Sequence, residues 1–327
     1  MMILIWIFTA FASPFSDKTM KGELTLLPMH RDLLLPKGRM SLGFDVASKN
    51  IIGYRDGNGN IVEYQNTNFL YNTSTLHYAN GFSNSITMYA TMPFVWQYLQ
   101  KTDFQKPIQT RALGDVRTGI RYSIHHTDVR QYALTAELKS PSGVEWPSSY
   151  SGYPNDIQGF LTGTGTTNLG IGSQMRWNVS PKYTMDVDLG YIQKFRAVVG
   201  YVIEKDGFGN GRIKPGNEIF VQWKHRFALR DHIEIDGWGA YSYRSTYLYG
   251  TSGEGVLWNN KQELMAPTSY ADAGLSFFYS PSIHHTWLIS LQQQIWGSGT
   301  ELFSLLGLEE FSPQPGMVYS FQYEVRW

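Results

Sequence analysis

The segment Met317–Trp327 reads MVYSFQYEVRW. From Met317 to Trp327, every second residue is aromatic or aliphatic, and Ser, Gln, Glu and Arg fill positions 320, 322, 324 and 326 between them. Successive side chains of a β-strand point to opposite faces, so this alternation predicts a strand with one apolar and one polar face.

The same alternation recurs along the chain from residue 39 onward. Clear examples are residues 86–94, 169–179 and 287–295, where apolar residues alternate with Thr, Gly, Ser, Gln or Arg. A further stretch at about residues 66–79 is rich in strand-forming residues, but its pattern leaves the apolar face undecided. The sequence therefore predicts about twelve strands.

The connections between these strands alternate in length. The short connections are Asn80–Ser83, Thr127–Arg130, Ser180–Lys182, Leu229–Asp231 and Pro281–Ile283. The long connections span about residues 49–65, 98–112, 141–164, 197–216, 248–267 and 298–315. Strict alternation places all tight turns on one rim and all long loops on the other, which is typical of an outer-membrane barrel. A β-sandwich has no reason to sort its connections in this way.

Composition narrows the class of protein further. Charged residues make up 17% of the 327 residues, below the roughly 25% of an average soluble domain, so the surface is poor in charge. The 27 basic and 27 acidic residues balance, which argues against a nucleic-acid-binding surface. The chain has no cysteine, so disulfides, thiol nucleophiles and cysteine-ligated metals are excluded.

Each strand has a charged face and an apolar face, and the size of the barrel decides which of them points outward. Twelve strands closed around an apolar interior would leave a void too wide for side chains to fill, because about eight strands is the packed limit. With lipid outside and a polar lumen inside, every backbone group is paired and the aromatic residues can form interfacial girdles. We therefore predict an all-β fold, a closed antiparallel transmembrane β-barrel with short periplasmic turns and long extracellular loops. A soluble two-sheet sandwich is the alternative.

The amino terminus suggests export. Residues 1–12 are apolar and end in Ala-Phe-Ala, the small-x-small form of a signal-peptidase site, so we expect a signal peptide there. Residues 13–38 form the next segment, whose leucines between Leu24 and Leu35 require burial, and we expect it to act as a plug in the turn-side mouth. Residues 39–327 then form the barrel.

Short turns allow the cross-strand partners of lumen charges to be predicted, because opposite charges on facing positions stabilise a sheet. The expected facing pairs are Arg176 with Asp186, Arg121 with Glu137, Lys224 with Glu234, and Gln222 with Asp236.

The polar face supplies the candidate lumen-lining and solute-contacting residues. They are Arg117, Arg121, Glu137, Lys139, Arg176, Asp186, Asp188, Gln222, Lys224, Glu234, Asp236 and Asp272. Their signs nearly cancel, which argues against a strongly ion-selective pore lined by rings of one sign. For most of them we favour an ion-pair network that braces the barrel.

The final strand also carries a candidate membrane-insertion signal. Its outward residues are Tyr319, Phe321, Tyr323, Val325 and Trp327. This pattern, with its aromatic carboxy terminus, resembles the recognition signal of bacterial outer-membrane barrels and implies insertion by the barrel-assembly machinery.

Several segments resemble the meta-pathway phenol-degradation (MetA-like) family of outer-membrane transporters and related outer-membrane barrels. The similar stretches are Leu33–Gly38 (LLLPKG), Gly114–Tyr122 (GDVRTGIRY), Leu161–Gly172 (LTGTGTTNLGIG) and, more weakly, Ile213–Glu218 (IKPGNE). The resemblance implies passive uptake of small solutes, including hydrophobic or aromatic ones.

Enzymatic or metal chemistry receives little support from the sequence. Most histidines lie near the short turns, as His77 and His225 do, and we interpret them as interfacial anchors rather than as a metal site. We expect no catalytic residues, no metal and no cofactor. The expected partners are outer-membrane lipid of a Gram-negative bacterium, the assembly machinery and a small solute, with no nucleic acid. The alternatives are a closed structural or adhesive barrel that acts through its surface loops and, less favoured, a lipid-modifying enzyme.

Overall fold

The computed structural model describes residues 33–55, 61–63, 67–101, 108–143, 166–195, 197–204, 207–214, 216–245, 247–251, 263–265, 267–282, 284–298 and 312–327. The expected signal peptide and most of the expected plug therefore lie outside the described residues. In the described part, no helix is both long and apolar enough to cross a membrane.

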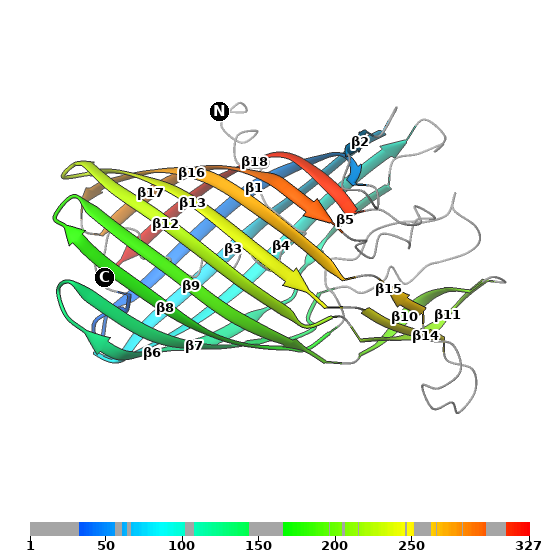
Figure 1. Ribbon diagram of the computed structural model, residues 1–327, viewed down its shortest axis with the longest axis horizontal. Helices are drawn as coiled ribbons and strands as arrows, with labels where there is room; N and C mark the ends of the chain where they lie inside the picture. Colours follow the sequence, from blue (N-terminus) through cyan, green and yellow to red (C-terminus); the bar gives the residue numbers. More distant parts are fainter. Residues whose placement is uncertain are drawn as a thin grey trace.

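The described chain is a closed antiparallel barrel of twelve strands, as the sequence predicts (Figure 1). The barrel strands are β1 (Met40–Arg55), β3 (Thr67–Ser83), β4 (Ile86–Lys101), β6 (Arg117–His126), β7 (Arg130–Lys139), β8 (Asn168–Ser180), β9 (Tyr183–Lys194), β12 (Glu218–Arg230), β13 (Ile233–Arg244), β16 (Thr268–Ser282), β17 (His285–Ser298) and β18 (Ser312–Arg326). Each pairs with its neighbours along the chain, and β18 closes the barrel against β1 with Ser41 opposite Arg326.

The tight turns gather at one end of the barrel, on the left in Figure 1, and the long connections at the other. The seam between β1 and β18 ends on the turn side, where Met40 and Trp327 exchange two backbone hydrogen bonds of 3.0 and 3.1 Å. The turn between β3 and β4 differs from its prediction, because β3 continues to Ser83 and the chain reverses at residues 84–85, beyond the predicted segment Asn80–Ser83.

Six short strands lie in segments that the sequence analysis treats as loops. β2 (Ile61–Glu63) pairs with β1, and β5 (Ile108–Leu113) pairs with β4. The other four form a separate antiparallel sheet past the loop-side rim: β10 (Ala197–Glu204), β11 (Gly207–Lys214), β14 (Tyr247–Thr251) and β15 (Glu263–Met265) (Figure 1). Its central pairing, β11 with β14, joins two different connections, so local sequence patterns could not predict it.

The outer face of the barrel is apolar on every barrel strand. Large exposed apolar side chains include Phe44, Met88, Ile120, Leu134, Ile171, Leu189, Trp223, Tyr241, Leu275, Ile289 and Tyr319. The sequence leaves the apolar face of β3 undecided. In the structure, Thr73, Thr75 and His77 are buried on its inner face, while Tyr78 is exposed on the outer one. A closed barrel with this outer surface is the structure of an outer-membrane protein, which confirms the predicted localisation.

Candidate functional site

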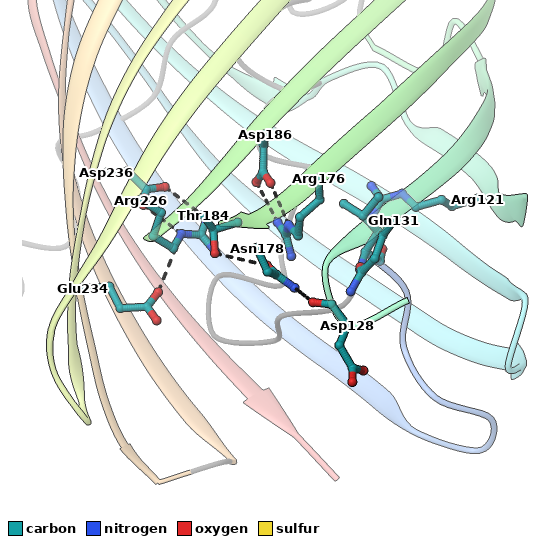
Figure 2. A network of polar contacts seen from close by, with 11 residues as sticks. Arg121, Asp128, Gln131, Arg176, Asn178, Thr184, Asp186, Arg226, Glu234 and Asp236 are labelled. Carbon is teal, nitrogen blue, oxygen red and sulfur yellow. Dashed lines mark hydrogen bonds and ion pairs between the residues drawn. The ribbon is translucent and has the colours of Figure 1, made fainter. Parts of the chain in front are cut away.

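The lumen of the barrel contains a wall of ion pairs, and the best formed joins β8 to β9. Arg176 and Asp186 face each other in the register, as predicted. The guanidinium donates two hydrogen bonds of 2.7 Å to the carboxylate, from Nε to Oδ1 and from Nη2 to Oδ2 (Figure 2). Both side chains are buried, so this bidentate geometry offsets the cost of removing two charges from water.

The hairpin of β12 and β13 has a similar pair in a different register from the predicted one. Arg226 faces Asp236 and donates hydrogen bonds of 2.8 and 3.0 Å to it, and its Nε lies 3.6 Å from Glu234 (Figure 2). The predicted facing pairs of this hairpin are wrong, because Lys224 lies opposite Trp238 and Gln222 opposite Ala240. The turn falls at residues 231–232, after an irregularity between Ala228 and Arg230, and each partner on β13 lies four residues further along the chain than predicted.

The hairpin of β6 and β7 also departs from its predicted register. An irregularity between Ser123 and His125 places Arg121 opposite Thr135 and Glu137 opposite Gly119. Glu137 instead pairs diagonally with Arg117, whose Nη1 lies 3.2 Å from Oε1. The predicted facing of Arg121 and Glu137 is therefore wrong, although both side chains lie in the lumen.

Two further ion-pair groups brace the loop-side part of the same wall. Lys139 Nζ lies 2.6 Å from Asp115 Oδ2. Glu218 accepts hydrogen bonds from Lys194 Nζ at 3.1 Å and from Arg244 Nη2 at 3.3 Å. Lys194, Arg244 and Asp115 are not among the predicted lumen-lining residues. The alternation of β9 and β13 nevertheless places Lys194 and Arg244 on the inner face.

The predicted lumen residues are all found on the inner side of the barrel. Buried there are Arg117, Arg121, Glu137, Lys139, Arg176, Asp186, Asp188, Gln222, Lys224, Asp236 and Asp272, while Glu234 is half-buried. Their part in solute contact stays a prediction.

Two aromatic rings lie flat on this wall over glycines of the next strand. A Cβ added at Gly190 would lie 2.1 Å from the Phe220 ring, and one at Gly274 would lie 2.5 Å from the Trp238 ring. Only glycine leaves room for each ring, so these side chains lie along the wall rather than across the lumen.

The described end of the amino-terminal segment enters the turn-side part of the lumen. Gly38, with φ of 77°, ends a tight turn in which the Arg39 amide donates to the Pro36 carbonyl at 3.0 Å. Further in, the Leu35 amide donates to Thr87 Oγ1 at 2.9 Å. The Leu33 amide donates to Gln131 Oε1 at 2.7 Å, and Leu33 O accepts from Arg121 Nη1 at 2.8 Å. Leu33, Leu34 and Leu35 are all buried.

The candidate insertion signal lies on the outer face of β18. Tyr319 and Trp327 are 45% and 49% exposed, and Tyr323 accepts or donates a hydrogen bond of 2.7 Å with His285 Nδ1. Trp287 of β17 packs between Phe321 and Tyr323, with ring centroids 5.6 and 4.3 Å away. The residues thus form an aromatic patch beside the seam, and their role in insertion stays a prediction.

The histidines divide into two groups. His225 and His285 lie on the outer face near the turns and bond to Tyr183 and Tyr323, as interfacial residues would. The prediction that His77 is an interfacial anchor is wrong, because His77 is buried on the inner face with its Nε2 3.7 Å from Asp45. Among the described residues, no group of three or more His, Asp or Glu side chains could hold a metal ion.

Comparison with known proteins finds likeness at the level of structure. No protein-family model and no curated protein matches the sequence. The COG4313 outer-membrane channel from Pseudomonas putida F1 superposes with a TM-score of 0.65 at 10% identity, covering 90% of this chain and 97% of that one. The Pseudomonas putida toluene transporter TodX gives a TM-score of 0.52 at 10% identity, covering 97% and 93%. The shared feature is the fold of outer-membrane barrels, and the resemblance to the MetA-like family stays a prediction.

Proposed function

We propose that this protein is an outer-membrane channel for the passive uptake of small solutes, including hydrophobic or aromatic ones. The observation that carries the proposal is the division of the barrel into an apolar outer face and a polar inner face whose charges are paired. Paired charges hold the wall in shape and leave little net field, so the lumen suits a passive conduit rather than a strongly ion-selective pore.

The fold supports this proposal without specifying the solute. Two proteins that share the fold are described as an outer-membrane channel and as a toluene transporter. We carry over only the general role from them, because at 10% identity the likeness is one of fold.

The test is planar-bilayer recording of the refolded protein, with a simple salt, a sugar and a small aromatic acid added in turn. We expect discrete open steps with weak preference between cations and anions, and blockade or passage of one of the organic solutes. A membrane that stays electrically silent, even after removal of residues 17–38, would contradict a channel.

A second candidate is a closed barrel that acts through its surface loops. It is favoured by the burial of Leu33–Leu35 inside the lumen, since this segment occupies part of the turn-side mouth. We propose that residues 13–38 act together as the plug, after removal of residues 1–12 as a signal peptide. A closed barrel would remain silent in the bilayer without this segment, whereas a plugged channel would open.

A further inference from the structure

The inner faces of β16, β17 and β18 differ in chemistry from the ion-paired wall formed by β6 to β13. Their inner positions carry amide, hydroxyl or apolar side chains, and we call this set the neutral strip: Gly274, Ser276, Phe278, Leu288, Ser290, Gln292, Gln294, Val318, Ser320 and Gln322. At its border with the ion-paired wall, the Arg226 guanidinium of β12 lies over the Phe278 ring, 5.1 Å from the ring centroid. In these described strands, the inner-face charges lie at the two ends of the strip, and Asp272 faces Gln294 in the register. Asp272 lies at the loop side, while Glu324 and Arg326 lie at the turn side and bond to each other at 2.7 and 2.9 Å.

The strand register shows that the strip is continuous. Ser276 faces Ser290, and Ser290 faces Ser320, so three hydroxyl groups follow one another across three strands. One row toward the loops, Gln292 lies opposite both Gly274 and Val318. Neighbouring rows of a sheet are in side-chain contact, so the strip is one surface rather than scattered positions.

Part of the strip, on β17 and at Ser320, is more accessible than the ion pairs of the opposite wall. Leu288, Ser290, Gln292, Gln294 and Ser320 are half-buried, although their side chains face the lumen. On the ion-paired wall, Arg176, Lys139 and Asp186 are 1%, 2% and 3% exposed. The inner face of β17 is therefore more accessible than these ion-paired side chains, whereas Ser276, Val318 and Gln322 of the strip are buried.

The chemistry of the strip selects against charge. Serine hydroxyl and glutamine amide groups can both donate and accept hydrogen bonds, so they can replace the water around a neutral polar solute. An ion passing along them would lose part of its hydration. The charges that border the strip on neighbouring strands are already engaged, as Asp236, which faces Ser276, is by Arg226. Leu288, which is half-buried, adds apolar surface for the carbon skeleton of the solute.

We propose that the solute pathway runs along the neutral strip and carries small uncharged solutes that bear hydroxyl, carbonyl or amide groups. This rests on the channel function proposed above and specifies its pathway and its solute class.

The natural absence of cysteine makes the pathway directly testable. In a Ser290→Cys variant of the full chain, N-ethylmaleimide, which is uncharged, should reach the strip and attach a bulky group there. The matched control is Ser242→Cys on the inner face of β13, where the serine is 1% exposed on the ion-paired wall. Both substitutions exchange one small side chain for another, so both barrels should fold.

Solute entry would be followed by swelling of proteoliposomes in isotonic erythritol or in isotonic sodium succinate, which are of similar size but differ in charge. We expect the parent protein to pass erythritol roughly tenfold faster than succinate. Treatment with N-ethylmaleimide should slow erythritol entry through the Ser290→Cys variant and leave the Ser242→Cys variant and the cysteine-free parent unchanged.

The outcomes separate the two proposals. If the parent passes neither solute, even without residues 17–38, the channel function itself fails. If the parent passes erythritol but modification slows only the Ser242→Cys variant, or neither variant, the pathway is wrong and the channel function stands. If succinate enters as fast as erythritol, the proposed solute class is wrong.

Discussion

Arg176 and Asp186 face each other on β8 and β9 and are joined by two hydrogen bonds of 2.7 Å inside the lumen. On the turn side of the pair, Asn178 accepts a hydrogen bond from Thr184 and donates one to the Asp128 carbonyl (Figure 2). This wall therefore depends on groups that cannot be removed singly without leaving a buried charge.

Removal of one partner should destabilise the barrel strongly. We expect Arg176→Ala to lower the free energy of unfolding by about 3–5 kcal/mol, because the Asp186 carboxylate would be left buried without its counter-charge. Urea unfolding in detergent micelles, followed by tryptophan fluorescence, measures this change. The control is Arg130→Ala, since Arg130 is exposed at the start of β7. An equal loss in both variants would show that the pair has no special role.

The close contact of Phe220 with Gly190 predicts a compensating pair of substitutions. Gly190→Ala should destabilise the barrel by about 1–3 kcal/mol, because the new Cβ would overlap the ring. Phe220→Ala combined with Gly190→Ala should recover part of that loss. The two single variants and the double variant form a cycle, measured by the temperature at which the folded band disappears in gel electrophoresis. Simple additivity would mean that the ring does not rest on Gly190.

The amino-terminal segment should limit conductance if it acts as a plug. Deleting residues 17–35 keeps the turn of Pro36 to Arg39 but removes Leu33 and Leu35 from the lumen, so single-channel conductance should rise. A milder variant, Thr87→Ala, removes one hydrogen bond to the segment and should produce more frequent transitions to the higher level. Conductance that is unchanged by the deletion would refute the plug.

The aromatic end of β18 should matter for assembly more than for stability. We expect Trp327→Ala to slow insertion into liposomes that contain the barrel-assembly machinery, while refolding in detergent stays close to normal. Met317→Ala is the matched control, because Met317 is 45% exposed on the same outer face and lies outside the proposed signal. If both variants insert at the parental rate, the signal is assigned to the wrong residues.

The faces of the strands were predictable because each face meets a different solvent. Outward side chains such as Ile289 meet lipid and must be apolar, while inward ones such as Ser290 meet the polar lumen. Apolar and polar residues therefore alternate along every strand, whatever its neighbours are. The same reasoning correctly placed every selected lumen residue on the inner side.

The registers of the strand pairs were harder to predict. Each depends on the position of the turn and on whether a bulge adds a residue to one strand beside it. The facing of Arg176 and Asp186 was correct because the turn between β8 and β9 lies within the predicted segment Ser180–Lys182, and the shift between Asn178 and Ser180 leaves the predicted partners in place. The facing of Arg121 and Glu137 failed because of a bulge beyond Ser123 that no residue pattern revealed. His77 was misassigned for another reason, because the pattern of its strand did not show which face was apolar.

The two backbone hydrogen bonds between Met40 and Trp327 have a consequence for the order of events during folding. These bonds, and the ladder from Ser41–Arg326 to Arg55–Ser312, join the two barrel strands that lie farthest apart in the sequence. Each of the other strand pairs can form as a local hairpin or by addition to a growing sheet, whereas this seam needs both edges present at once. Until then β1 and β18 expose unpaired edges that invite pairing with other chains. Before the seam forms, the paired strands make an open sheet. Pairing of β1 with β18 closes that sheet into a barrel and, in the same event, removes the two edges through which it could aggregate.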